Sequence, residues 1–252
     1  MHGLRRPLQN LALLLMLIPI RPRALEGQQW PVHDTARPAP PAVEPGTVQQ
    51  PPSDAIVLFA GPDLSQWKMK SGGPAAWKVD GDYFEIVPGT GDMVSARGFG
   101  DCQLHLEWAT PLPARGEGQD RGNSGIFLMG LYEVQILDSY RSRTYADGQA
   151  AALYGQFPPL VNASRPPGAW QSFDIVFRRP RFSADGKLQR PARMTIFHNG
   201  VLVHDNVELT GATAHKVRAT YQAHPDRLPL LLQDHGHPVR FRNIWLRELP
   251  SP

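Results

Sequence analysis

Short apolar stretches recur along the chain from residue 56 to residue 249, and each is cut by Gly, Pro, Asn or Asp. Many of them alternate apolar with polar residues, which is typical of strands because successive side chains point to opposite faces of a sheet. We expect strands at residues 56–59, 77–79, 83–87, 93–96, 103–108, 126–129, 132–137, 170–177, 192–198, 201–207, 230–233 and 239–249. No long amphipathic helix interrupts them, so the sequence predicts an all-β fold, a two-sheet antiparallel sandwich of the jelly-roll type.

One tight turn is marked clearly in the sequence. Asn199 and Gly200 separate the apolar runs MTIFH and VLVHD, and a type I′ turn needs residues that tolerate positive φ at both central positions. The two flanking strands are therefore predicted to form a hairpin. Asp-Gly pairs at 80–81 and 185–186 carry a weaker form of the same signal.

The first 24 residues have the pattern of a secretory signal peptide. Two arginines precede an apolar run at 11–20, which is too short to span a bilayer. We therefore expect a signal peptide at 1–24 and export to the periplasm or the extracellular space. An uncleaved membrane anchor remains the alternative, because the residues just before Ala24 suit a cleavage site poorly.

A proline-rich segment follows the signal. Residues 25–53 contain seven prolines and almost no apolar periodicity, so they have no face that could dock against a core. Closely spaced prolines hold a chain near polyproline II geometry, which predicts a disordered, semi-rigid linker. One domain is then expected at 54–252.

Composition narrows the possible classes of function. Cys102 is the only cysteine, so no disulfide can form within the chain and the domain must be stabilised by its core. The net charge of +3 is small and no basic stripe stands out, which argues against a nucleic-acid partner. No nucleophile elbow, Walker loop or dinucleotide fingerprint is present, so serine chemistry and nucleotide cofactors are disfavoured.

The central segment RGNSGIFLMGLYEVQILDS, residues 121–139, reads as a hairpin that carries a site. Alternation places Glu133 and Gln135 on one face of its second strand, with apolar residues on the other. In a regular strand Asp138 falls on the opposite face. A β-bulge at 136–137 would turn it back beside Glu133 and Gln135. Asn123, in the turn before the hairpin, is a candidate substrate ligand.

The spacing E-x-Q-x-x-D is similar to the E-x-D-x-x-E strand of laminarinase-type retaining glucanases. Such enzymes need a nucleophile and an acid roughly 5 Å apart. Gln135 cannot ionise and Asp138 is shorter than Glu, so a double displacement on this strand is less plausible. A strand whose polar face simply meets solvent is the alternative.

Other polar candidates lie on separate strands. Glu107 lies on the polar face of the strand at 103–108, while Gln233 and His235 share one side of an extended segment. A divalent metal ion could be bound by Glu107, Glu133, Asp138 and His235. No H-x-H or H-x-x-x-H spacing supports such a site locally, and a metal requirement stays open.

A loop at 155–169 is long for a sandwich, and long loops often form the rims of sites. Tyr154 and Trp170 flank this loop and are candidates to stack on a sugar ring. Arg165, within it, is a candidate substrate ligand.

Four segments carry a family resemblance: FAGPDLSQWK, RGNSGIFLMGLYEVQILDSY, TYADGQAAALYGQFPPLVNASRPPGAWQSFDIVF and LLLQDHGHPVRFRNIWLREL. Together they resemble the 3-keto-disaccharide hydrolase domain over about residues 56–249. The resemblance implies a concanavalin-like jelly roll, a glycoside as the partner, and cleavage of glycosides whose glucose ring carries a 3-ketone.

The resemblance also suggests a mechanism in which a nucleophilic carboxylate is not needed. A ketone at C3 acidifies the C2 proton, so a base can remove it and the C1 oxygen can leave by elimination, with or without later addition of water. We expect Glu133 or His235 as the base, Gln135 as an amide that orients a hydroxyl, and Arg165, His235 or a metal ion as the group that stabilises the enolate. A retaining β-glycosidase that uses Glu133 and Asp138, and a non-catalytic carbohydrate-binding module, remain alternatives.

Overall fold

The computed structural model describes residues 30–47, 50–218 and 220–251. Among the described residues, 39–47, 50–218 and 220–250 belong to one compact unit, and residues 30–38 and 251 belong to another. The expected signal peptide lies outside the described residues. Within the described residues, no helix has the length and apolar character needed to cross a membrane.

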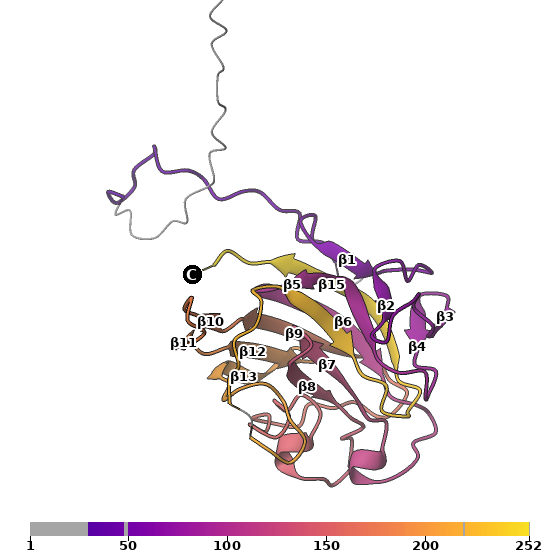
Figure 1. Cartoon of the computed structure of the whole chain (residues 1–252). Helices are drawn as coiled ribbons and strands as arrows, with labels where there is room; N and C mark the ends of the chain where they lie inside the picture. The colour runs from indigo at the N-terminus through magenta and orange to yellow at the C-terminus, as the bar shows by residue number, and fades with distance from the viewer. Residues whose placement is uncertain (1–29, 48–49, 219, 252) are drawn as a thin grey trace, which may run out of the picture. The chain divides into compact units, whose positions relative to one another are not determined.

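The larger unit contains two antiparallel sheets that pack into a sandwich and, apart from them, a small two-stranded sheet (Figure 1). The first sheet contains, in spatial order, β13 (Val201–Glu208), β12 (Arg193–His198), β9 (Gln171–Arg178), β6 (Cys102–Ala109), β15 (Arg240–Glu248), β4 (Tyr83–Glu85) and β3 (Lys78–Asp80), and β1 (Ile56–Phe59) also pairs with β15. The second contains β2 (Trp67–Met69), β5 (Met93–Phe99), β14 (Leu228–Leu232), β7 (Ser124–Leu128) and β8 (Tyr132–Ile136). This confirms the predicted all-β sandwich.

All twelve predicted strands overlap observed ones, and the described residues add three short strands that the sequence pattern did not indicate. These are β2, β10 (Arg181–Phe182) and β11 (Leu188–Arg190), which have three, two and three residues. Alternation cannot be recognised over so few positions. The only helices in the described residues are two 3₁₀ turns, η1 (Gly118–Asp120) and η2 (Ala146–Gly148).

The Asn-Gly turn has the predicted geometry. Asn199 and Gly200 have φ angles of 52° and 79°, and they join the antiparallel pair β12 and β13. Both central residues are therefore left-handed, as a type I′ turn requires.

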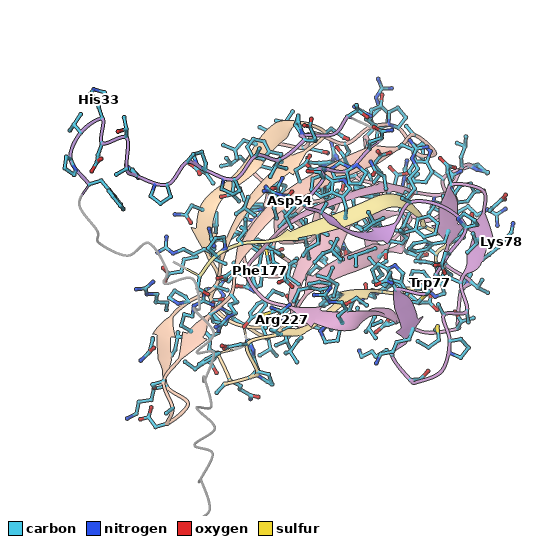
Figure 2. The ribbon with its side chains drawn as sticks, turned by 90° about the horizontal axis from the view of Figure 1, so that it is seen from above. His33, Asp54, Trp77, Lys78, Phe177 and Arg227 are labelled. Atoms are coloured by element: carbon cyan, nitrogen blue, oxygen red, sulfur yellow. The ribbon has the colours of Figure 1, made fainter. Side chains whose placement is uncertain are left out.

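The core lies between the two sheets and is built by alternation. On β6, Leu104, Leu106 and Trp108 are fully buried, and Val134 and Ile136 of β8 belong to the same apolar cluster. Figure 2 labels Phe177, which is buried in this core, and Lys78, which is exposed at the margin. Because Val134 and Ile136 face the core, Glu133 and Gln135, which alternate with them along β8, face away from it.

Candidate active site

A pocket of about 290 Å³ lies on the face of β7 and β8 that points away from the core, beside the segment that follows β14. It brings together six of the ten residues singled out from the sequence. They are Asn123, Glu133, Gln135, Tyr154, Gln233 and His235. Phe127, Thr213, Ala214 and His215 complete its lining.

Regular strand pairing explains why these side chains meet. Gly125 of β7 lies opposite Gln135 of β8, and Phe127 lies opposite Glu133. The Gln233 N–H donates to Gly125 O at 3.0 Å, which holds the end of β14 against β7. Residues two apart on a strand share a face, so Glu133 and Gln135 both reach the pocket.

Glu133 is the one carboxylate in the lining of this pocket, and it is buried. Its exposed fraction is 6%, and burial raises its pKa to about 8. Within the described part of the chain, no salt bridge to Glu133 is found that would offset this desolvation. Its carboxylate lies over Gly125, where an added Cβ would be 2.6 Å from Oε1. The glycine therefore provides the space that the carboxylate occupies.

Amide groups organise the floor of the pocket beside Glu133. Gln135 donates through Nε2 to Oε1 of Gln119 at 3.0 Å, and Gln119 in turn donates to Gly148 O at 2.8 Å. Asn123 donates to Gln119 O at 2.7 Å. Turned by half a rotation, the Gln135 amide would instead donate to Glu133 Oε1 at 3.2 Å.

Gln119 was not predicted from the sequence, although it connects both amides to the loop that contains η2. It lies in the 3₁₀ turn η1, where no periodic pattern marks a functional position. Only its contacts reveal its part in the site.

The segment after β14 places His235 at the exposed side of the pocket. The neighbouring Asp234 accepts hydrogen bonds from Gly89 N at 2.8 Å and Gly91 N at 3.0 Å. Those contacts fix the backbone just before the histidine. The imidazole of His235 stacks near that of His237, with ring centroids 6.3 Å apart.

Asp138 does not join Glu133. The pairing of β7 with β8 is regular over Tyr132–Ile136 and does not extend to residue 137, so it does not test the bulge predicted at 136–137. Ile136 and Leu137 both belong to the apolar core cluster. β8 ends at Ile136. The Asp138 carboxylate is buried against Arg121, with Oδ2 2.7 Å from Nε, and it lines a separate pocket of about 450 Å³.

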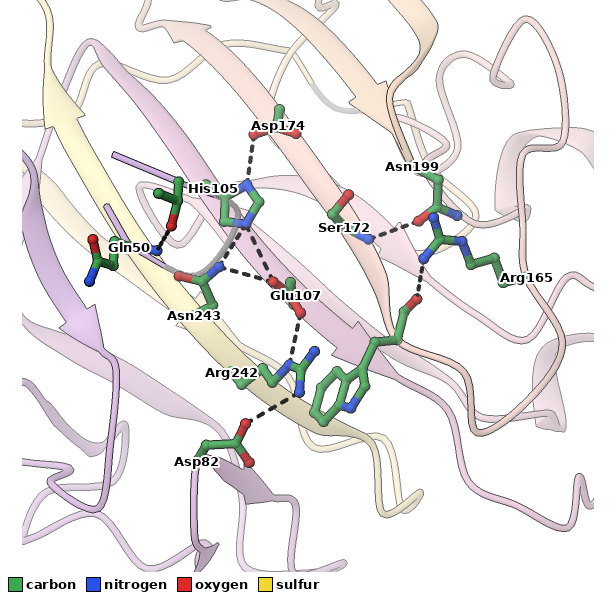
Figure 3. A network of polar contacts seen from close by, with 12 residues as sticks. Gln50, Asp82, His105, Glu107, Arg165, Ser172, Asp174, Asn199, Arg242 and Asn243 are labelled. Atoms are coloured by element: carbon green, nitrogen blue, oxygen red, sulfur yellow. Dashed lines mark hydrogen bonds and ion pairs between the residues drawn. The ribbon is translucent and has the colours of Figure 1, made fainter. Parts of the chain in front are cut away.

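Glu107 also lies outside the pocket, on β6 of the larger sheet. Figure 3 shows it bonded to Arg242, at 2.8 Å, and to Asn243, at 2.9 Å, beside His105. Burial raises the pKa of Glu107, but the hydrogen bonds from His105, Asn243 and Arg242 outweigh burial and lower it to about 2. Burial likewise opposes the charge on His105, but hydrogen bonds to Asp174 and Glu107 raise its pKa to about 9.

Arg165 of the long loop and Trp170, which follows this loop, lie near Arg242 and Glu107. Trp170 packs against Arg242, whose Cζ is 4.2 Å from the ring centroid, and Arg165 donates to Trp170 O at 2.9 Å. Neither lines the pocket of Glu133, so the predicted roles of Arg165, Trp170 and Glu107 in that pocket are not supported by their positions.

The four residues considered as metal ligands are not assembled. Glu107 and Asp138 lie in separate surroundings from Glu133 and His235. Among the described residues, no group of three or more His, Cys, Asp or Glu side chains is placed to bind a metal ion.

A comparison with known protein families explains the four sequence segments that carry the resemblance. Residues 54–247 match the family described as the 3-keto-alpha-glucoside-1,2-lyase-like domain. The chain belongs to this family. The match includes every residue that lines the Glu133 pocket, and it confirms the resemblance drawn from the sequence.

Solved structures agree with this membership. A candidate glycosyl hydrolase from Parabacteroides distasonis is 42% identical, with a TM-score of 0.82, and the alignment covers 86% of this chain and 95% of that chain. Two others from the same organism, 19% and 17% identical, have TM-scores of 0.58 and 0.56. They cover 78% and 77% of this chain, and 94% and 99% of theirs, and show the shared fold alone.

Among curated proteins no match is found. Family and solved structures together support a carbohydrate-active enzyme of the hydrolase or lyase type for this lyase-like domain.

Proposed function

We propose that the lyase-like domain cleaves the glycosidic bond of 3-keto-glycosides by removing the C2 proton and eliminating the C1 substituent, with or without later addition of water. The observation that carries the proposal is the buried position of the Glu133 carboxylate in the pocket. Glu133 is the only carboxylate among the residues that line the pocket, and burial holds its pKa near 8. The family description supports the substrate class.

The chemistry needs one base next to a ketone. Glu133 takes the C2 proton, and the negative charge passes to the oxygen of the ketone as an enolate. That charge then forms the C1–C2 double bond while the C1–O bond breaks, and the leaving oxygen keeps the electron pair and takes up a proton. A base with a raised pKa is better matched to a weakly acidic C–H proton than an ordinary carboxylate is.

The developing enolate needs hydrogen-bond donors. Asn123, Gln233 and His235 line the pocket and can supply them. Arg165 was also expected to stabilise the enolate, but it lies beside Trp170 and does not line this pocket. Stabilisation of the enolate is therefore assigned to Asn123, Gln233 and His235.

A retaining glycosidase mechanism is less well supported by the geometry. It requires two carboxyl groups roughly 5 Å apart across the scissile bond. Asp138 is paired with Arg121 and lines a different pocket. A binding module, in turn, has no use for a desolvated carboxylate that lacks a cation, because such a group costs stability.

The test compares matched oxidised and parent glycosides, with product release followed by chromatography. We expect turnover of the 3-keto-glycosides alone. In heavy water, wild type should also exchange deuterium into C2 of a 3-keto sugar that cannot lose its C1 group. Equal turnover of both substrates would support the retaining mechanism, and no turnover across a broad panel would support the binding module.

A further inference from the structure

A second pocket, of about 520 Å³, adjoins the pocket of Glu133. The two share Tyr154, Ala214 and His215. The pocket beside Asp138 shares no lining residue with that of Glu133. A glycoside that extends beyond the Glu133 pocket therefore enters the second pocket first.

The volumes of the two pockets indicate which part of a glycoside each pocket binds. At about 290 Å³, the Glu133 pocket is near the lower limit of small-molecule sites, which span roughly 300 to 1,000 Å³, and it suits a single sugar ring. The larger pocket is left for the group attached through C1. Tyr154 lies at the junction, where the bond between the two parts must pass.

Aromatic side chains give the second pocket a preference for flat groups. Tyr145 and Tyr154 are joined through their hydroxyls at 2.8 Å, with their rings inclined by 68°. The bond holds both rings in place, and 48% of Tyr145 is exposed. Fixed aromatic faces of this kind bind another planar ring by stacking or edge contact.

Charge gives the pocket a second preference. Lys216 and Arg218 line it, and no ion pair to either is found in the part of the chain that the structure describes. Asp147 is the only carboxylate in the lining, which leaves one surplus positive charge. A pocket lined by a surplus of one sign attracts groups of the other sign.

We propose that this second pocket is the leaving-group subsite, and that it selects glycosides whose C1 substituent is a planar ring carrying a negative charge. The inference rests on the proposed function, because it assigns the pocket by the position of the scissile bond. The probes are 4-carboxyphenyl 3-keto-glucoside and its uncharged 4-carbamoylphenyl analogue, which have nearly the same shape.

Wild type is compared with the double variant Lys216→Gln with Arg218→Gln. In each protein the ratio of kcat/KM for the charged substrate to that for the uncharged one is measured, so that intrinsic leaving-group differences cancel between proteins. We expect the ratio to fall about tenfold in the double variant, and the wild-type ratio to fall with added salt. Arg115→Gln, which removes a cation from the pocket beside Asp138, should leave the ratio unchanged.

Methyl 3-keto-glucoside separates the two proposals. If wild type cleaves it but the charge ratio is the same in the double variant, the subsite is overturned and the proposed function stands. If wild type cleaves none of the three 3-keto-glucosides, the proposed function fails. The subsite is then judged by calorimetric binding of 4-hydroxybenzoate against 4-hydroxybenzamide, and equal affinities in wild type would overturn it.

Discussion

Two glutamates of this molecule occupy similar positions in similar strands and end in opposite electrostatic states. Glu107 on β6 and Glu133 on β8 each alternate with buried apolar residues. Hydrogen bonds from Arg242, Asn243 and His105 hold the pKa of Glu107 at about 2 despite burial, whereas burial alone raises the pKa of Glu133 to about 8. The difference lies in the partners that the fold supplies, because both carboxylates are largely buried.

The comparison separates a stabilising carboxylate from a reactive one. A paired charge contributes to stability because the fold replaces the water it loses, while an unpaired buried charge weakens the fold. Perturbed groups of the second kind gather at functional sites, where their reactivity is retained at the expense of stability. Exchanging the carboxylates for amides, one at a time, tests this division.

The largest expected effect is on activity. Glu133→Gln should lower kcat/KM for a 3-keto-glycoside by about 10²- to 10⁴-fold, because the amide cannot accept the C2 proton. It should also lose deuterium exchange at C2 while still binding the sugar. Glu107→Gln is the matched control, and its activity should stay within a few-fold of wild type. If Glu133→Gln keeps near-wild-type exchange and His235→Ala abolishes it, the base is His235.

The next effect is on the pH profile. Because the base must be ionised, kcat/KM for the wild type should rise about tenfold per pH unit below pH 8 and level off above it. Initial rates at low substrate concentration across pH 5 to 10 measure this. A plateau that begins near pH 4.5 would show an ordinary carboxylate and contradict the effect of burial on Glu133.

The smallest effects are on stability and have opposite signs. The folded pKa of Glu107 is depressed, so its contribution is present above its unfolded pKa and is lost as pH falls toward about 2. Glu107→Gln should therefore lower the free energy of unfolding by roughly 2 kcal/mol at pH 7, the usual value for a charged hydrogen bond. The folded pKa of Glu133 is raised, so its contribution is full below its unfolded pKa and is lost as pH rises to about 8.

Glu133→Gln should consequently stabilise the protein by about 1 kcal/mol or more at pH 9, and by less at pH 5. Denaturant titrations of Glu107→Gln at pH 7 and of Glu133→Gln at pH 5 and pH 9, each against wild type, measure these effects. A loss of stability at pH 9 in Glu133→Gln would mean that an unseen partner satisfies the ionised carboxylate.

The sequence predicted the strands well because alternation is a local property. The shared face of Glu133 and Gln135 follows from it, and both residues line one pocket. Alternation could not predict the position of Asp138, because this residue follows the end of β8. Its N–H is taken by Arg121 O at 3.0 Å after β8 has ended, and its side chain is held by the same arginine.

The partners of each glutamate could not be predicted for a related reason. Arg242 is 135 positions from Glu107 in the chain, and only the pairing of β15 with β6 brings them together. Gln119 and His215 enter the Glu133 site from a 3₁₀ turn and a loop. Residues in such segments show no periodicity, so their contribution becomes visible only with their contacts.

Cys102, the single cysteine of the sequence, begins β6 and has an exposed fraction of 1%. Burial raises the pKa of its thiol far above the usual range, so the reactive thiolate is scarce at neutral pH. A cysteine introduced at the rim of either pocket would then be the one thiol that a maleimide dye reaches. The native chain is in this respect already a background for site-specific fluorescent labelling, and no cysteine has to be removed before ligand entry is followed by such a probe.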